Sequence, residues 1–157
     1  KATAKGNVTF EDERYNAKAK RAKYDLVKST FDASGKTSLL DKNENRTLKG
    51  DKVNLQFFEQ KDSQRLNMKD LKQARASGHV SLTTPSEYIE AVYAQYDPPH
   101  AVVTAQKNVQ MVHQKGIIEG DYAQAKLDQK IYRVEGKKSP DKGVVYGLIF
   151  PNKQEKK

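Results

Sequence analysis

The histidines and a few carboxylates are the residues of this chain that could do acid–base or metal chemistry. His79, His100 and His113 form neither an H-x-x-x-H nor an H-E-x-x-H pattern, so their spacing does not favour a metal site. Asp51 and Asp121 each follow a glycine and could be imagined as a carboxylate pair. Turn or bulge chemistry explains them more simply, because Asp tolerates such backbone and accepts local N–H bonds.

Nucleophilic residues are equally poorly placed for catalysis. The chain has no cysteine, which removes disulfides, thiolate nucleophiles and cysteine-ligated zinc. Ser34 and Ser77 lie in A-S-G phrases rather than in a G-x-S-x-G elbow, and the glycines are dispersed with no phosphate-binding cluster. We therefore expect a protein that is not an enzyme and that uses no cofactor and no metal.

Composition favours a thin β-sandwich with a basic surface. Of the 157 residues, 36% are hydrophobic and 31% are charged, which suits strands that give half of their side chains to water. The net charge of +9 would attract nucleic acid, anionic lipid headgroups or acidic polymers. The apolar run Val144–Phe150 is far shorter than the roughly 20 residues that span a bilayer.

Internal repeats are the strongest signal in the sequence. Four phrases occur twice: A-x-x-A-x-Y-D at 19–25 and 91–97, A-S-G-x-x-S-L at 33–39 and 76–82, a G-D phrase at 48–51 and 118–121, and an A-x-x-N-V phrase at 4–8 and 105–109. Val134-Glu135-Gly136 closes the series. Glycine inside a strand pattern marks a bulge or a bend. Small or glycine residues at regular positions in the repeats would therefore let successive strands bend at the same place and stack.

Period-2 alternation predicts strands in several of these segments. Val53, Leu55 and Phe57 alternate with polar residues and so fall on one face. The segment from Tyr15 to Leu26 has helical spacing, and Leu66 to Ala74 is ambiguous in the same way, but Tyr88–Asp97, the repeat partner of the first segment, favours a strand. Since two copies of one unit should share one structure, we predict an all-β chain of about ten or more strands.

The wording and order of these phrases resemble the OstA-like family of lipopolysaccharide-transport bridge proteins, of the LptA type. The match rests on Ala4 to Val8, Ala19 to Asp25, Gly50-Asp51, Ala91 to Asp97 and Ile118 to Gly136. It implies an elongated, bent β-jellyroll over residues 1–151, followed by a charged tail at 152–157. Family members begin with a further strand, whereas only Lys1-Ala2-Thr3 precede the first phrase here, so the resemblance allows for a missing first strand.

The resemblance also implies a function. The protein would be a non-enzymatic periplasmic carrier that shelters the acyl chains of lipopolysaccharide (its lipid A part) in an apolar groove and links an inner-membrane exporter to an outer-membrane translocon, without binding nucleic acid. An alternative is a basic β-protein that binds nucleic acid or another polyanion, with Lys, Arg and Tyr forming a stacking surface.

Two sets of residues are the candidates for this function. The apolar residues that would line the groove, or else form an ordinary sandwich core, are Phe31, Leu55, Phe57, Val80, Leu82, Val109, Met111, Ile118 and Val134. The residues of the two edge strands, where other OstA-like domains or further copies of the chain would pair head to tail, are Val8, Phe10, Val144, Tyr146, Leu148 and Phe150.

Overall fold

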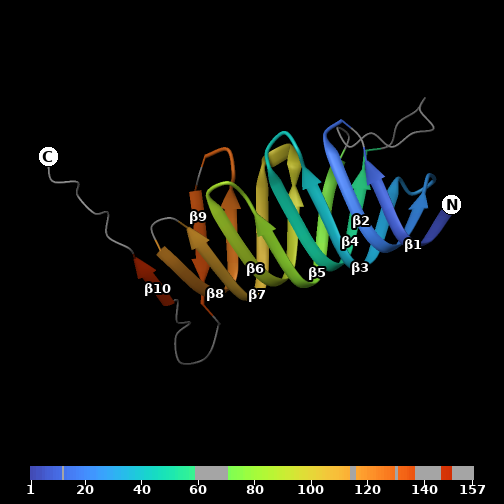
Figure 1. Ribbon diagram of the computed structural model, residues 1–157. Helices are drawn as coiled ribbons and strands as arrows, with labels where there is room; N and C mark the ends of the chain where they lie inside the picture. The colour runs from blue at the N-terminus through green and yellow to red at the C-terminus, as the bar shows by residue number, and fades with distance from the viewer. Residues whose placement is uncertain (12, 59–70, 114–115, 130, 137–145, 150–157) are drawn as a thin grey trace, which may run out of the picture.

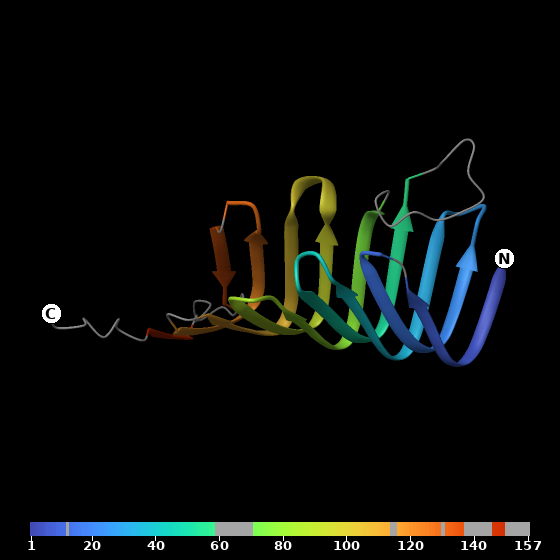
Figure 2. The same cartoon turned by 45° about the horizontal axis from the view of Figure 1, so that its top comes forward.

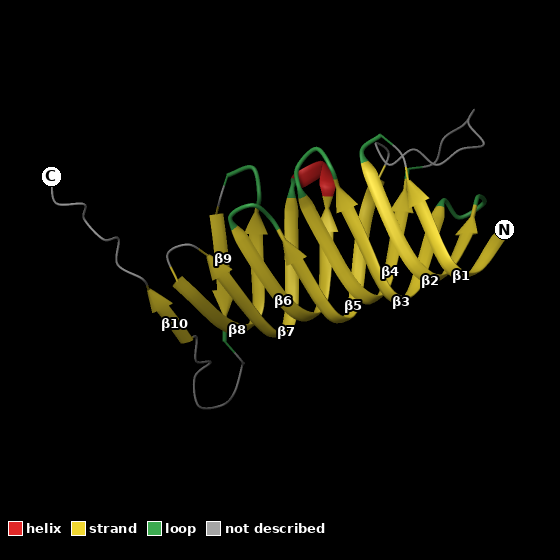
Figure 3. Ribbon diagram, in the orientation of Figure 1, coloured by secondary structure: helices red, strands yellow, loops and turns green. Residues whose placement is uncertain are grey.

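The structure is a computed structural model that describes residues 1–11, 13–58, 71–113, 116–129, 131–136 and 146–149. In this part of the chain one 3-10 turn, η2 (Pro98–His100), accompanies ten strands (Figures 1 and 3). The strands are β1 (Ala2–Glu11), β2 (Tyr15–Asp25), β3 (Thr30–Asp41), β4 (Arg46–Phe57), β5 (Leu71–Thr83), β6 (Glu87–Asp97), β7 (Val102–His113), β8 (Gly116–Lys126), β9 (Ile131–Glu135) and β10 (Tyr146–Ile149).

The strands form one antiparallel sheet in which each strand pairs with the next along the chain, from β1 to β8. Beyond β8, β9 pairs with its residues 122–126 and β10 with its residues 116–119. The result is an elongated molecule with β1 at one end and β9 and β10 at the other (Figure 1). The expected all-β, elongated architecture is confirmed.

Every strand pair from β1–β2 to β7–β8 has a register shift near its middle. These shifts lie between Lys5 and Val8, Lys18 and Arg21, Ser34 and Thr37, Lys49 and Lys52, Ser77 and Val80, Glu90 and Tyr93, and Gln106 and Val109. Because a bulge bends its strand, a line of bulges across the sheet folds the sheet on itself. The strands are accordingly V-shaped in Figure 2.

We name the two sides of this bend by the side chains that they turn inward. The alanine half comprises residues 2–5, 21–25, 30–34, 52–57, 71–77, 93–97, 102–106, 122–126 and 131–135. The leucine half comprises residues 8–11, 15–19, 37–41, 46–49, 80–83, 87–90, 109–113, 116–120 and 146–149. The two halves face each other as the layers of a sandwich, joined along the bend.

The repeat phrases supply the backbone that the bend requires. Gly35-Lys36 in β3 and Gly78-His79 in β5 have positive φ, and so do Lys107-Asn108 in β7. A side chain at Gly78 would lie 2.4 Å from Asp51 Oδ2 and 2.9 Å from its Cβ. Glycine is therefore required there both for backbone conformation and for space.

The core lies between the two halves. Nearest the bend, the inward residues of the alanine half are small, which lets the halves approach closely; they are Ala22, Ala33, Val53, Ala76, Ala94, Ala105 and Ala123. Farther out, Leu55 and Phe57 are buried against Val80 of the leucine half. The alternation of Val53, Leu55 and Phe57 on one buried face confirms the period-2 prediction.

The segment with helical spacing is a strand. Residues 15–25 form β2, which pairs with β1 on one side and β3 on the other, and Tyr15, Ala22 and Asp25 are buried. Two ladders of backbone hydrogen bonds outweigh the high helix propensity of its Ala and Lys residues. Of the second ambiguous segment, Leu71 to Ala74 opens β5, whereas Leu66 and Met68 lie outside the described residues. Among the helices described, none is long and apolar enough to cross a membrane.

Candidate functional site

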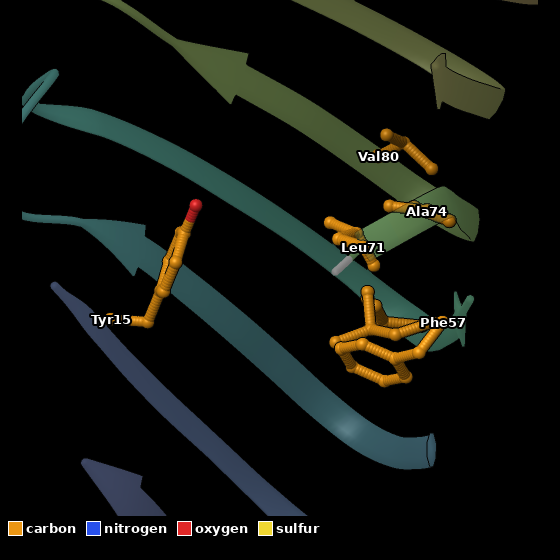
Figure 4. Close-up of a cluster of buried hydrophobic side chains, with 8 residues drawn as sticks. Tyr15, Phe57, Leu71, Ala74 and Val80 are labelled. Carbon is orange, nitrogen blue, oxygen red and sulfur yellow. The ribbon is translucent and has the colours of Figure 1, made fainter. Parts of the chain in front are cut away.

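The two halves enclose a cleft of about 270 Å³, which we call the interior cleft. The leucine half contributes Leu39, Leu48 and Leu82 to its lining, and the alanine half contributes Leu71, Ala74, Ala94, Tyr96 and Val103. Of the core side chains near the cleft, Tyr15 stands apart, whereas Phe57, Leu71 and Ala74 lie together (Figure 4). The volume approaches the lower end of the range for ligand pockets, about 300 Å³.

Strand register explains why one wall of the cleft is continuously apolar. Paired residues on neighbouring strands share a face of the sheet. Across the leucine half this places in one inward row Leu39, Leu48, Leu82, Ile89, Met111 and Ile118. The row crosses six strands, so it forms an apolar strip perpendicular to them along the length of the sheet.

Charged side chains lie at the mouth of the cleft, where the strands of the leucine half begin or end farthest from the bend. Arg14 donates to Asp41 through Nε (3.2 Å to Oδ1) and Nη2 (2.7 Å to Oδ2), and its guanidinium lies 4.9 Å from the centre of the Tyr15 ring. Burial would raise the pKa of the Asp41 carboxyl, but the hydrogen bond from Arg14 and the nearby backbone N–H groups outweigh burial and lower it. Arg46, paired with Glu44 at 3.4 Å, also lines the cleft. The mouth therefore presents two guanidinium groups beside an apolar interior.

The apolar interior continues toward β1. The lining of a smaller cavity of about 20 Å³ includes Val8, Phe10, Phe31, Leu39 and Leu55. Phe10 is 40% exposed, because β1 is the last strand at this end of the described sheet. Leu39 lines both the smaller cavity and the interior cleft, so the two spaces share a wall.

Toward the C-terminal end of the sheet, a side-chain hydrogen bond joins the alanine half to the leucine half. The hydroxyl of Tyr132 in β9 donates a hydrogen bond to Glu87 Oε1 in β6, and the Tyr132 ring lies 6.4 Å from the ring of His113 in β7. Burial, and then the bond to Glu87, raise the pKa of Tyr132 to about 12. Tyr132 and Glu87 therefore fasten the alanine half to the leucine half near β9, beyond the interior cleft.

Most of the candidate groove residues face the space between the halves. Leu55, Phe57, Val80, Val109 and Met111 are buried in the core. Phe31, Leu82 and Val134 are half-buried and pack against it. Ile118 shares the face of Met111 but is 36% exposed. Of this set, Leu82 lines the interior cleft, while Phe31 and Leu55 line the smaller cavity.

Sequence reasoning missed several lining residues that the repeats could have supplied. Leu39 holds the same position in its A-S-G phrase as Leu82 does in the second copy, and Leu48 corresponds to Ile118 in the two G-D phrases. The structure places all four in one inward row. Arg14 and Asp41 belong to no repeat phrase, and their pairing depends on the turn between β1 and β2.

The edge-strand candidates are described in part. Val8 and Phe10 lie in β1, in which a bulge near Gly6 joins two stretches that both pair with β2. Tyr146 and Leu148 lie in β10, whereas Val144 and Phe150 fall outside the described residues. Within those residues, no group of three or more His, Cys, Asp or Glu side chains could hold a metal ion. The chemistry offered is an apolar cleft with two guanidinium groups at its mouth, each paired with a carboxylate.

Comparisons with known proteins support the fold. No family model and no curated protein matches this sequence. Among solved structures, the chain is similar to LptH, the LptA-homologous periplasmic component of the lipopolysaccharide transport device of Pseudomonas aeruginosa. The TM-score is 0.71 at 13% sequence identity, over 87% of this chain and 95% of the LptH chain. The chain therefore has the LptA-type fold that its repeats led us to expect.

Proposed function

We propose that this protein is a non-enzymatic periplasmic carrier that holds lipopolysaccharide by its acyl chains in the interior cleft. The observation that carries the proposal is the cleft itself, whose walls of Leu39, Leu48, Leu71 and Leu82 end at guanidinium groups. An apolar space beside cations matches a molecule with hydrocarbon chains and phosphates.

Energetics favour a reversible carrier. Each methylene that leaves water contributes about 0.8 kcal/mol, so partial burial of one acyl chain supplies several kcal/mol of binding. Charge-assisted hydrogen bonds from Arg46 and Arg14 to a phosphate would orient the headgroup at the mouth. Arg14 already holds Asp41, whereas Arg46 has a longer contact with the half-exposed Glu44. We therefore assign the larger share of phosphate binding to Arg46.

The likeness to LptH supports the ligand class and the compartment, because that protein is a periplasmic component of a lipopolysaccharide transport device. In such a device the carrier would pass its ligand to other proteins with the same fold. The edge of β1 offers a place for strand pairing with another chain, which would serve head-to-tail self-association or a junction with a partner in the bridge.

The proposal is tested with two single-cysteine variants of this cysteine-free chain. Leu48→Cys places a thiol on the cleft wall, and Lys49→Cys places one on the exposed opposite face of the same strand. Each is labelled with an environment-sensitive fluorophore and titrated with lipid A. We expect a saturable blue shift for the label at position 48 and no shift at position 49. Equal responses at both positions, or none at position 48 with the fold intact by circular dichroism, would refute an interior acyl site.

A further inference from the structure

A second and larger hollow, of about 720 Å³, lies on the outer face of the alanine half, and we call it the outer trough. Its lining comes from β1 to β7 of that half. The floor is the backbone of the small inward residues of the alanine half (Ala22, Ala33, Val53, Ala76 and Ala94), which we call the alanine row. Their side chains point the other way, into the core. The outer trough and the interior cleft thus lie on opposite faces of one sheet layer.

Two ladders of polar side chains form the walls of the outer trough. Strand register aligns Arg21, Ser34, Lys52, Ser77, Tyr93 and Gln106 along one wall. It aligns Lys23, Asp32, Asn54, Arg75, Gln95 and Thr104 along the other. From β1 to β7 there are six strand spacings, so the outer trough extends about 29 Å across the sheet. That length suits an extended chain rather than a compact molecule.

The charge of the walls is unbalanced. The described lining contains four cations, Arg21, Lys23, Lys52 and Arg75, and one carboxylate, Asp32. Asp32 accepts a hydrogen bond of 2.7 Å from Asn54 Nδ2. None of the four cations takes part in the ion pairs found among the described residues. An anionic ligand would therefore meet cations that are not already neutralised by a partner.

Neutral hydrogen-bonding groups alternate with these cations. Ser34, Asn54, Ser77 and Gln95 are half-buried between the longer side chains, so their hydroxyl and amide groups are held near the floor. Such groups both donate and accept, as the hydroxyls of a sugar require. Tyr93 is 45% exposed and could stack on a sugar ring, with Lys107 Nζ 5.1 Å from the centre of its ring.

We infer that the outer trough binds an anionic oligosaccharide, as a free chain of sugars that carry carboxylate, sulfate or phosphate groups. A single-stranded nucleic acid would need several aromatic side chains on which successive bases stack, and Tyr93 is the one aromatic residue of the described lining. A lipid would need apolar side chains in the outer trough, whereas those of the alanine row point into the core. Because the site lies on the opposite face from the interior cleft, the inference does not rest on the proposed function.

The experiment uses hexagalacturonate as the probe, with maltohexaose as the neutral sugar and oligothymidylate as the nucleic acid. Two double variants remove the same charge: Lys52→Ala with Arg75→Ala in the outer trough, and Lys18→Ala with Lys49→Ala on the exposed outer face of the leucine half. All four positions are exposed, so both variants should fold, which circular dichroism verifies. Binding is measured by calorimetry at low salt, and amide shifts are mapped by NMR.

We expect hexagalacturonate to bind, to shift the amides of Ser34 and Ser77 rather than those of Ser38 and Ser81, and to lose about tenfold or more in affinity in the trough variant. The control variant should change affinity by less than about twofold, since distant exposed charges are screened. Equal losses in the two variants would reduce the effect to net charge and overturn the site. Equal affinity for maltohexaose, or tighter binding of oligothymidylate, would overturn the assignment of the ligand.

Discussion

At the scale of single residues, the bend depends on positions that tolerate left-handed backbone. Gly6, Gly35 and Gly78 mark β1, β3 and β5, and in β7 the pair Lys107-Asn108 takes the same conformation without glycine. Asn108 adopts this left-handed backbone more readily than most residues do, but for Lys107 the same conformation is strained. His79 follows Gly78 in β5. Its Nδ1 lies 2.8 Å from Asp51 Oδ2, and this hydrogen bond raises the pKa of His79.

Gly78 and Gly6 form a matched pair for testing how the bend is stabilised. Both have positive φ, but a Cβ at Gly6 would meet nothing within 4 Å, whereas one at Gly78 would crowd Asp51. We expect Gly6→Ala to lower the free energy of unfolding by about 1–2 kcal/mol through backbone strain alone. Gly78→Ala should cost about 1–3 kcal/mol more, because the side chain overpacks the bend. Urea unfolding measures both values, and equal losses would show that backbone conformation is the whole effect.

At the scale of elements, β9 is a short strand that pairs with one other described strand, β8. It has five residues, yet it carries Tyr132, whose hydroxyl reaches Glu87 in β6. Since the pKa of Tyr132 is raised above its ordinary value, the tyrosine is a neutral donor at neutral pH, and the bond is lost only as the pH rises through about 12. The bond therefore holds β9 in place under physiological conditions.

Removing this hydroxyl should loosen β9 selectively. Tyr132→Phe keeps the ring beside His113 but deletes a hydrogen bond to a carboxylate, which is worth about 1.5 kcal/mol. We expect amide hydrogen exchange in Ile131–Glu135 to speed up about tenfold while β4 and β5 stay protected. Tyr122→Phe, which removes a hydroxyl from the neighbouring strand β8, serves as the control. Unchanged exchange in β9 would mean that its pairing with β8 suffices.

Repeats predicted the elements better than any local pattern did. Residues 15–25 have helical spacing, and only the match of residues 19–25 to residues 91–97 identified them as a strand, because the spacing within one segment does not show which neighbouring segments pair with it. The groove candidates included Leu82 and Ile118 of the inward row, but the interior cleft also uses Leu71 and Tyr96, which belong to the opposite half. An inward residue packs in the core or lines a cleft according to the distance between the two halves at its position. Alternation along one strand does not reveal that distance.

At the scale of the whole molecule, the sheet has two different ends. β1 lies at one end with a ten-residue edge, and at the other end the shorter β9 and β10 follow one another along β8. Unpaired backbone groups along such edges invite another strand. Because the two ends differ, pairing between copies would be heterologous, and heterologous contacts grow into filaments unless a rotation closes them.

We therefore predict head-to-tail association that depends on both ends. A chain with Thr9→Cys in β1 and a second chain with Leu148→Cys in β10 should form a disulfide-linked heterodimer when mixed under mild oxidation, while either alone stays largely monomeric. One chain carrying both substitutions should form a ladder of linked oligomers on a non-reducing gel. Deleting residues 144–157 should abolish the concentration-dependent light scattering of the parent protein, since it removes β10 and leaves the pairing of β1 to β8 intact. Homodimers from Thr9→Cys alone would indicate symmetric pairing of two β1 edges, which closes after two copies and cannot extend a bridge. A strict monomer across the concentration range would leave the interior cleft as the site of a carrier that works without forming filaments.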